Sequence, residues 1–377
     1  MRLIINATNL QQGGALQVAS ELLTEWSSAF PGQEYHVFLS PQLEAVLSRA
    51  GFPDTFHFYT FTGNPARSLW SALTFHRRLS QLEAQIRPDL VFTVFGPALW
   101  TPRALHFCGF ANGYYLFDQS AYIRKRVTAN LLRWIPYYLR RALLLRQLRR
   151  EADMLWVETE AAQRQLSAIG NAFIAVVGNT YSRCLQPGPH TAQAQQPRFL
   201  YLSAWYPHKN MEILPEVLQL LQRQQWSGQI LMTLPGPVFD RLFAGKCPEG
   251  SVVNLGPVHA GQLQQAYEQA DAVLIPTLLE TFTAAYPEAM RMEKPILTSD
   301  LPFATTVCAD AALYFDPYRA EDIAACMLRL MQEPQLYERL RRKGRERLAM
   351  LETPSSRAAK LMSCMMNLQN AGSLCAE

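Results

Sequence analysis

The chain has 377 residues, of which 49% are apolar and 18% charged, and its formal net charge is +4. This length suits two domains of roughly 150–190 residues each, and the composition excludes an intrinsically disordered chain. The mild net charge does not by itself indicate a nucleic-acid-binding protein, and no run of about 18 apolar residues predicts a transmembrane helix.

The first half of the chain predicts strands that alternate with helices. Leu3–Ala7 is typical of a first strand rather than of a signal peptide. A loop with Gly13 and Gly14 follows, and Ala15–Trp26 has helical spacing. Further strands are predicted at Glu34–Leu39, Leu90–Phe95, Leu105–Phe110, Met154–Glu158 and Phe173–Val177. This alternation predicts a parallel sheet covered by helices.

The pattern stops at Tyr181–Pro197, a stretch with three prolines that is typical of an interdomain linker, and then begins again. Strands are predicted at Arg198–Leu202, Ile230–Leu234, Val252–Leu255, Ala272–Ile275 and Pro295–Thr298. Helices are predicted at Asn210–Gln224, Gly261–Ala270, Ala284–Met292, Ala320–Gln332 and Gln335–Leu351.

These patterns predict two α/β domains, at 1–185 and 198–355, with a last helix at about 356–377 that packs back on the first domain. Ligands of open parallel sheets bind at the carboxyl ends of the strands, so we expect the two halves to face each other across a ligand-binding cleft. Seven scattered cysteines, without any Cys-x-x-Cys spacing, favour reduced thiols in a cytosolic protein.

The segment Pro276–Met290 carries two carboxylates next to a predicted strand. Glu280 lies in the loop after Ala272–Ile275, and Glu288 lies in the following helix. Thr281 or Thr283 is expected to cap that helix and to leave backbone N–H groups free for a phosphate. A solvated loop glutamate and an ordinary surface helix glutamate remain the alternative.

This segment resembles the E-x7-E signature of retaining glycosyltransferase family 4. The segment from Ser203 to Asn210 resembles the Gly-Arg-Leu-x-x-x-Lys-Gly segment of that family, with Lys209 at the phosphate-binding lysine. The segment from Asn254 to Val258 resembles the stretch whose backbone reads the donor base. The resemblance covers roughly Arg198–Leu348, and the first half matches only in its pattern and its glycine loop.

The resemblance implies the GT-B fold, in which two Rossmann-like domains face each other across a cleft. It implies that Glu280 contacts the transferred sugar, that Glu288 binds the ribose and that Lys209 neutralises the diphosphate. The implied donor-binding residues are Gly13, Gly14, Ser203, His208, Lys209, Val258, Glu280, Thr281, Phe282, Thr283 and Glu288.

Three departures from the family pattern affect these roles. The family arginine is Ala204 here, and His208 beside Lys209 is one candidate to replace its charge. Two family glycines are Thr281 and Thr283. The acceptor-side histidine of the family has no clean match. His106 and Asn112 are candidates for it, although a histidine near an apolar strand is more often a core residue.

We expect no metal and no cofactor beyond the nucleotide-sugar donor. The chain contains no Asp-x-Asp motif, and a lysine with backbone N–H groups can neutralise a diphosphate. If the anomeric configuration is retained, as the resemblance implies, a same-face displacement assisted by the leaving phosphate is the expected mechanism.

The stretch 124–150 contains one lysine, eight arginines and no acidic residue, interleaved with aromatic residues and leucines. This composition suits an anionic membrane surface, and an arginine-rich helix packed on its domain is the alternative. We expect no nucleic acid as a partner. The expected location is the cytoplasm, with docking at the inner face of the cell membrane through this stretch.

The sequence therefore predicts a glycosyltransferase that moves a hexose-type sugar from a nucleotide-diphosphate sugar to a glycan or polyprenyl-diphosphate-linked acceptor, in bacterial surface polysaccharide synthesis. A nucleotide-sugar epimerase of GT-B architecture and a catalytically inactive sugar-nucleotide-binding partner of a membrane complex remain alternatives. An NAD-dependent dehydrogenase is disfavoured, because Gly13 and Gly14 lack the Gly-x-Gly-x-x-Gly spacing.

Overall fold

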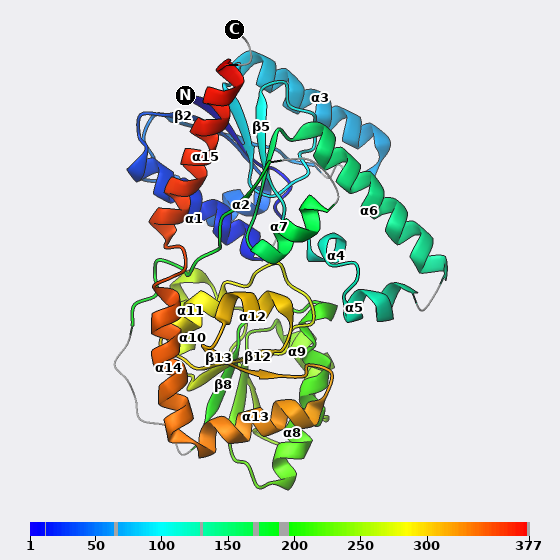
Figure 1. Ribbon diagram of the computed structural model, residues 1–377, viewed down its shortest axis with the longest axis vertical. Coiled ribbons are helices and arrows are strands. Elements are labelled where there is room, and N and C mark those ends of the chain that lie inside the picture. Colours follow the sequence, from blue (N-terminus) through cyan, green and yellow to red (C-terminus); the bar gives the residue numbers. More distant parts are fainter. Residues whose placement is uncertain (12, 64–66, 129–130, 169–172, 188–195, 375–377) are drawn as a thin grey trace. The chain divides into compact units, whose positions relative to one another are not determined.

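The chain folds into two α/β units (Figure 1). Unit 1 comprises Met1–Asn179 together with Thr353–Glu377, and unit 2 comprises Thr180–Glu352. The computed structural model describes residues 1–11, 13–63, 67–128, 131–168, 173–187 and 196–374. The expected linker Tyr181–Pro197 contains no helix or strand in its described part, and its residues 188–195 lie outside the described residues.

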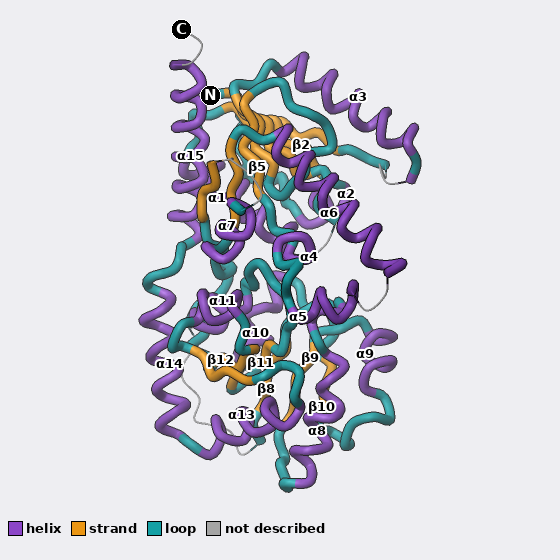
Figure 2. Tube along the Cα trace, turned by 45° about the vertical axis from the view of Figure 1, so that its right-hand side comes forward, coloured by secondary structure: helices purple, strands orange, loops and turns teal. Residues whose placement is uncertain are grey.

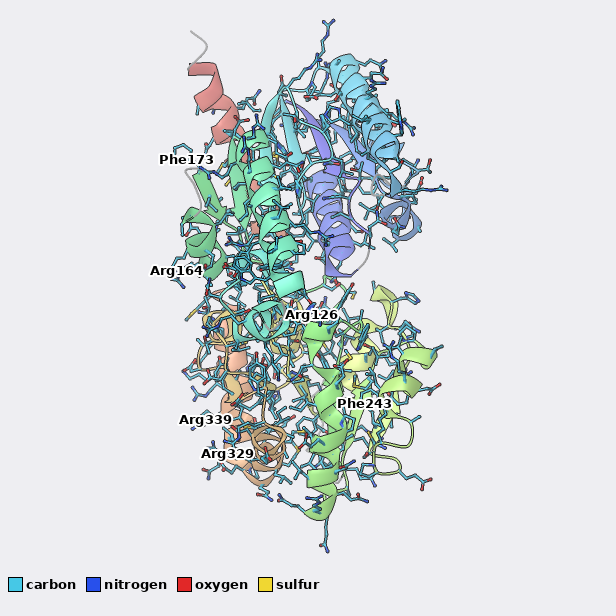
Figure 3. The ribbon with its side chains drawn as sticks, turned by 90° about the vertical axis from the view of Figure 1, so that its right-hand side faces the viewer. Arg126, Arg164, Phe173, Phe243, Arg329 and Arg339 are labelled. Carbon is cyan, nitrogen blue, oxygen red and sulfur yellow. The ribbon has the colours of Figure 1, made fainter. Side chains whose placement is uncertain are left out.

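Unit 1 contains a seven-stranded parallel sheet with the strand order β3-β2-β1-β4-β5-β6-β7. The strands are β1 (Arg2–Ala7), β2 (Glu34–Leu39), β3 (Phe56–Thr60), β4 (Leu90–Thr93), β5 (Leu105–Gly109), β6 (Met154–Val157) and β7 (Phe173–Val176). Phe173 begins the edge strand β7, and its side chain is exposed (Figure 3). The direction of strand addition reverses between β1 and β4.

Helices cover both faces of the unit 1 sheet (Figure 2). The core on one face includes residues of α1 and α15, and the cores on the other include residues of α3, α6 and α7. The helices are α1 (Gly14–Ala29), α2 (Pro41–Val46), α3 (Leu69–Ile86), α4 (Gly113–Leu116), α5 (Ala121–Ile123), α6 (Leu131–Glu151), α7 (Glu160–Ser167) and α15 (Pro354–Leu374), with a π-helical turn η2 (Arg124–Thr128) before α6.

The last helix belongs to unit 1 although it follows unit 2 in the sequence. The indole nitrogen of Trp26, on α1, donates a hydrogen bond to the carbonyl of Ala358, on α15, at 3.0 Å. The buried guanidinium of Arg357 donates to Oδ1 of Asn179 at 2.7 Å. Apolar packing and these two contacts fix α15 on the first unit.

Unit 2 contains a six-stranded parallel sheet with the strand order β10-β9-β8-β11-β12-β13. The strands are β8 (Arg198–Tyr201), β9 (Gln229–Met232), β10 (Val252–Asn254), β11 (Ala272–Ile275), β12 (Ile296–Ser299) and β13 (Ala312–Phe315). One face is covered by α8 (Leu214–Arg223), α9 (Gly236–Phe243), α13 (Ala320–Gln332) and α14 (Pro334–Leu348), and the other by α10 (Leu263–Glu268), α11 (Ala285–Arg291) and α12 (Pro302–Cys308).

Most predicted elements are present with bounds that differ by one to three residues, and the larger differences are two strands and the start of one helix. The strands β3 and β13 were not predicted, and both lie at sheet edges, where some of their residues are half exposed. The helix expected from Asn210 begins at Leu214, after two short 3-10 turns at Pro207–Lys209 and Met211–Ile213. Asn210, at φ +58°, interrupts it.

The cysteines of the described residues are free thiols, and Cys375 lies outside that part of the chain. No helix among the described residues has both the length and the apolar character that crossing a bilayer requires.

Candidate functional site

The site residues of unit 2 gather where its strand order reverses. From β8 the sheet continues through β9 to β10, and from β11 it continues in the other direction through β12 to β13. Lys209 follows β8, Glu280 follows β11, and these two strands pair directly. Open parallel sheets bind ligands at the carboxyl ends of the strands beside such a reversal. The positions of Lys209 and Glu280 therefore mark the expected ligand edge.

Lys209 and Glu280 form a buried ion pair. The Nζ of Lys209 donates a hydrogen bond to Oε1 of Glu280, and the two side chains are only 14% and 13% exposed. Burial raises the pKa of the Glu280 carboxyl, and the charge of Lys209 opposes that rise. The two loops are also joined through their backbones, because the N–H of Leu278 donates to the carbonyl of His208 at 2.8 Å.

Hydrogen bonds from Tyr201 and Asn210 hold the loop that carries Lys209. The buried hydroxyl of Tyr201, at the end of β8, donates to the carbonyl of Lys209. Asn210 adopts the left-handed conformation, and its side chain donates to the carbonyl of Pro317 at 2.7 Å. These contacts fix the backbone of Lys209, so its ammonium group is held at the sheet edge.

The loop between β11 and α11 offers backbone donors, although not by the predicted capping. The N-cap of α11 is Ala284, which makes no side-chain cap, so the prediction that Thr281 or Thr283 caps this helix was wrong. Within the described residues, no backbone carbonyl accepts a hydrogen bond from the N–H groups of Phe282, Thr283 or Ala284. Because α11 has only seven residues, these loop N–H groups matter more than its dipole.

Glu288 is buried inside unit 2 rather than solvated on a helix surface. Its side chain is 2% exposed, and Oε2 accepts a hydrogen bond from the hydroxyl of Tyr267 at 2.9 Å. Tyr267 is fully buried in the helix α10, and burial raises the pKa of its hydroxyl. The burial of Glu280 and Glu288 rules out the alternative of two solvated surface carboxylates.

The segment after β8 adds polar and aromatic groups around Ala204. The N–H of Ser203 donates to Oγ1 of Thr233 at 3.2 Å, which links the ends of β8 and β9. The ring of His208 stacks on Tyr206 with centroids 5.5 Å apart. A cation that the sequence analysis missed lies here, because Arg241 of α9 stacks over Trp205 at 4.4 Å. No spacing rule links these two positions in the sequence.

The segment from Asn254 to Val258 leaves the end of β10 as a loop without helix or strand. The side-chain oxygen of Asn254 accepts hydrogen bonds from the N–H groups of Leu234, at 3.0 Å, and Gly256, at 3.2 Å. Gly256 has φ +75°, a conformation that favours glycine. Val258 packs against the core beneath α10 and α11. The backbone of this loop is therefore held by hydrogen bonds at the same strand-end edge as Lys209.

In unit 1, the predicted glycine loop lies at the carboxyl end of β1. Gly13 is the N-cap of α1 with φ +74° and makes no side-chain cap, and Gly14 is the first residue of that 16-residue helix. Both glycines are exposed, and a Cβ atom built on Gly14 meets nothing within 4 Å. The loop thus presents bare backbone at the start of α1.

The structure excludes His106 as an acceptor-side residue, because it is fully buried, whereas Asn112 is exposed and stays a candidate. His106 is fully buried, with Nε2 2.8 Å from the hydroxyl of Thr93 and Nδ1 2.6 Å from the carbonyl of Glu151. Burial lowers the pKa of His106 to about 4. With both ring nitrogens engaged inside the sheet, His106 is a core residue. Asn112 is exposed at the N-cap of α4, after β5.

The basic stretch forms most of the helix α6, with its apolar residues on two sides. Leu145 and Leu148 are buried against the sheet. Four large apolar side chains are 42–59% exposed: Trp134, Ile135, Leu139 and Leu143. Exposed basic side chains accompany them at Lys125, Arg126 (Figure 3), Arg140, Arg146, Arg149 and Arg150.

Not every arginine of this stretch faces solvent. Arg141 is half-buried, pairs with Asp118 at 3.3 Å and donates to the carbonyl of Tyr115 at 2.9 Å. The side chain of Arg133 and residues 129–130 lie outside the described residues. The exposed apolar residues named above distinguish α6 from an ordinary solvated helix, whose exposed face is polar.

Comparisons with known proteins agree with this geometry. Residues 185–347, which lie within unit 2, match the family model "Glycosyl transferases group 1". No curated protein sequence matches the chain significantly.

Several solved structures have the same fold at low sequence identity. A sucrose-phosphate synthase from Thermosynechococcus elongatus is 15% identical, with a TM-score of 0.76 over 98% of this chain and 100% of that chain. HepE from Anabaena, solved in complex with UDP and glucose, is 13% identical, with a TM-score of 0.73 over 97% and 100% of the two chains. WaaG, a glycosyltransferase involved in lipopolysaccharide biosynthesis, is 13% identical, with a TM-score of 0.71 over 96% and 98%.

These findings confirm the predicted GT-B fold of two Rossmann-like units, and residues 185–347 of unit 2 are similar to group 1 glycosyltransferases. Assignment to retaining family 4 and to its E-x7-E group stays a prediction, as do the roles of the individual site residues.

Proposed function

We propose that this protein is a retaining glycosyltransferase that moves a hexose-type sugar from a nucleotide-diphosphate donor to a glycan or polyprenyl-diphosphate-linked acceptor. The observation that carries the proposal is the buried pair of Lys209 and Glu280 at the strand reversal of unit 2, with the buried Glu288 in the next helix. A buried ion pair contributes little to fold stability, so its place at the ligand edge favours a role in binding.

The donor diphosphate binds in this proposal to the ammonium group of Lys209 and to the loop N–H groups of Phe282, Thr283 and Ala284. The diphosphate replaces Glu280 as the counter-ion of Lys209, which releases Oε1 of Glu280 to accept hydrogen bonds from the sugar hydroxyls. Glu288 accepts hydrogen bonds from the ribose hydroxyls. Tyr267 acts as a positioning residue, because it holds Oε2 of Glu288.

The proposed reaction is a same-face displacement. The acceptor hydroxyl oxygen forms a bond to the anomeric carbon while the bond from that carbon to the donor phosphate oxygen breaks. The proton of the acceptor hydroxyl passes to the leaving phosphate. Negative charge grows on the diphosphate as its bond breaks, so the fixed cation and N–H groups stabilise the transition state more than the ground state. The proposal needs no metal ion, because Lys209 and these N–H groups supply the charge stabilisation.

In unit 1, Asn112 is proposed to bind the acceptor, and the loop of Gly13 and Gly14 is proposed to approach both the donor phosphates and the acceptor. These residues expose a side-chain amide and bare backbone at the carboxyl ends of β5 and β1. Synthesis of a bacterial surface polysaccharide is the proposed pathway. It is supported by the resemblance in sequence and by the fold shared with WaaG, a glycosyltransferase involved in lipopolysaccharide biosynthesis.

We also propose that the protein acts in the cytoplasm and docks on the inner face of the cell membrane through α6. Exposed tryptophan, isoleucine and leucine side chains enter the acyl boundary in this proposal, and the surrounding arginines meet anionic headgroups. A lipid-linked acceptor would be presented at the same surface.

Two other functions fit the same donor site. A nucleotide-sugar epimerase would convert the donor without an acceptor. A binding-only partner would hold the donor without turnover. The observation that favours it is Ala204, which stands at the position of the family arginine and removes one cation from the diphosphate site. The intact Lys209, Glu280 and Glu288 favour catalysis.

A donor screen followed by a product assay tests these functions. Nucleoside diphosphates and nucleotide sugars are screened by thermal shift, because a ligand of the folded state raises the melting temperature by mass action. The donor so found is incubated with a glycan and lipid-linked acceptor panel. We expect acceptor-dependent release of nucleoside diphosphate. Isomerised donor without acceptor would indicate the epimerase, and binding without turnover would indicate the binding partner.

A further inference from the structure

A compact group of metal-ligating side chains lies in unit 1, at the amino-terminal ends of its strands. Glu34 and His36 are two residues apart on β2 and therefore point to the same face of the sheet. His57 on the edge strand β3 pairs directly with His36. The proposed donor residues follow the carboxyl ends of strands, including Gly13 and Gly14 after β1, so this group lies at the opposite ends of the strands.

The three side chains converge through one atom each. Oε1 of Glu34 lies 3.1 Å from Nε2 of His36 and 3.9 Å from Nε2 of His57. One potential ligand atom from each of the three residues lies within 4.8 Å of the other two. Ligand atoms on a tetrahedral zinc ion are about 3.3 Å apart, given zinc–nitrogen bonds of about 2.0–2.1 Å. Small side-chain rotations therefore suffice to bring these atoms onto one ion.

Neighbouring side chains hold two of these groups in orientations suited to a metal. Nδ1 of His36 lies 3.1 Å from the hydroxyl of Tyr59, so that nitrogen can carry the proton while Nε2 keeps its lone pair for the ion. Arg2 donates from Nε to Oε2 of Glu34 at 2.8 Å and leaves Oε1 facing the histidines. Arg2 also donates to the carbonyl of Ile86 at 2.9 Å, which fixes its own position.

His36 forms the buried side of this group, and Glu34 and His57 form its solvent-exposed side. His36 is 7% exposed, whereas the side chains of Glu34 and His57 are 38% and 44% exposed. An ion can therefore enter from solvent, and water can complete its coordination. In a simple hydrogen bond, one proton is shared between Glu34 and one histidine, and the second histidine has no role. Here both histidines face the same carboxylate oxygen of Glu34, as the ligands of one metal ion would.

We propose that Glu34, His36 and His57 form a binding site for a divalent transition metal ion, with Zn²⁺ as the expected ion. Two imidazole nitrogens and a carboxylate are ligands that zinc prefers. The ion ties the edge strand β3 to β2 and so stabilises unit 1. It supplies no chemistry to the donor site.

The test uses the full chain after treatment with a chelator, titrated with Zn²⁺ by isothermal titration calorimetry near neutral pH. We expect one saturable site in the wild type and a melting temperature that rises with Zn²⁺. His57→Gln removes an exposed ligand with little effect on the fold, and it should weaken Zn²⁺ binding at least about tenfold and abolish the rise. His76→Gln, which changes an exposed histidine on α3, is the matched control and should bind like the wild type.

Titration with Co²⁺ identifies the ligands independently. We expect visible absorption bands without a thiolate charge-transfer band, and we expect Glu34→Gln to weaken them as His57→Gln does. The proposal is overturned by the lack of a saturable site, by equal affinity of His57→Gln and the wild type, or by thiolate bands, which would assign the ion to a cysteine such as the exposed Cys184.

Discussion

The ammonium group of Lys209 donates a hydrogen bond to the carboxylate of Glu280, and this contact joins the loops that follow the paired strands β8 and β11. Both side chains are largely buried at the point where the strand order of unit 2 reverses. The contact therefore places one cation and one carboxylate at the edge where parallel α/β sheets bind ligands.

Replacing Lys209 by methionine should weaken the binding of nucleoside diphosphates and of inorganic pyrophosphate alike, each by at least about tenfold. Both ligands need the cation that neutralises the diphosphate. The variant should also be less stable, because Glu280 stays buried without its cation. Isothermal titration calorimetry measures the affinities. Lys246→Met, an exposed lysine of the same unit, is the control. Unchanged pyrophosphate affinity would remove Lys209 from the phosphate site.

Replacing Glu288 by glutamine should weaken nucleoside diphosphates but leave pyrophosphate binding unchanged, because Glu288 is assigned to the ribose. The wild type should prefer a ribonucleoside diphosphate over its 2′-deoxy form, and Glu288→Gln should lose much of that preference. Tyr267→Phe should have a smaller effect in the same direction, since it removes only the hydrogen bond that positions Oε2. Equal losses for pyrophosphate and nucleotide in Glu288→Gln would contradict the ribose assignment.

His106 should behave as a core residue with a depressed pKa of about 4. Its neutral form is favoured in the folded state. The resulting stability is fully present above the unfolded pKa of about 6.5 and is lost as the pH falls toward 4. The loss is up to about 3 kcal/mol. Histidine NMR should show no titration of His106 between about pH 7 and 5. A titration midpoint near 6.5 would show that His106 is solvated.

Charged substitutions on α6 should release the protein from anionic membranes. Leu139 and Leu143 are 58% and 59% exposed, so changing both to glutamate should leave the fold intact. Flotation with anionic vesicles should show salt-sensitive binding of the wild type and none of the variant. Met350→Glu, a 75% exposed residue of unit 2, is the control. Wild-type protein that stays at the bottom of the gradient would exclude membrane docking through α6.

The sequence predicted most of the fold because the central strands are continuous apolar runs. Ala272–Ile275 and Glu34–Leu39 were predicted with the bounds that the structure has. The edge strand β3 was missed because its residues Phe56–Thr60 mix apolar and polar side chains without a strict alternation. The edge strand β13 has an apolar run, but with four residues it is too short for periodicity alone to identify it as a strand.

The candidate site was predicted less completely, since it depends on contacts between distant residues. The spacing of Glu280 and Glu288 placed them on a loop and a helix, yet it did not reveal that Glu288 is buried and Glu280 largely so. The pairing of Glu280 with Lys209 spans two loops that meet only after the sheet forms. The capping prediction failed because the chain continues as a loop through Thr283 and enters α11 only at Ala285.

Acceptor-dependent release of nucleoside diphosphate, compared between the wild type and Glu280→Ala, tests the central claim most directly. Glu249→Gln, an exposed glutamate of unit 2, serves as the control. We predict turnover by the wild type and the control, and a fall in kcat/KM of about 10²–10³-fold in Glu280→Ala, because a contact at the reacting sugar is lost. Turnover by Glu280→Ala at the wild-type rate would contradict the account.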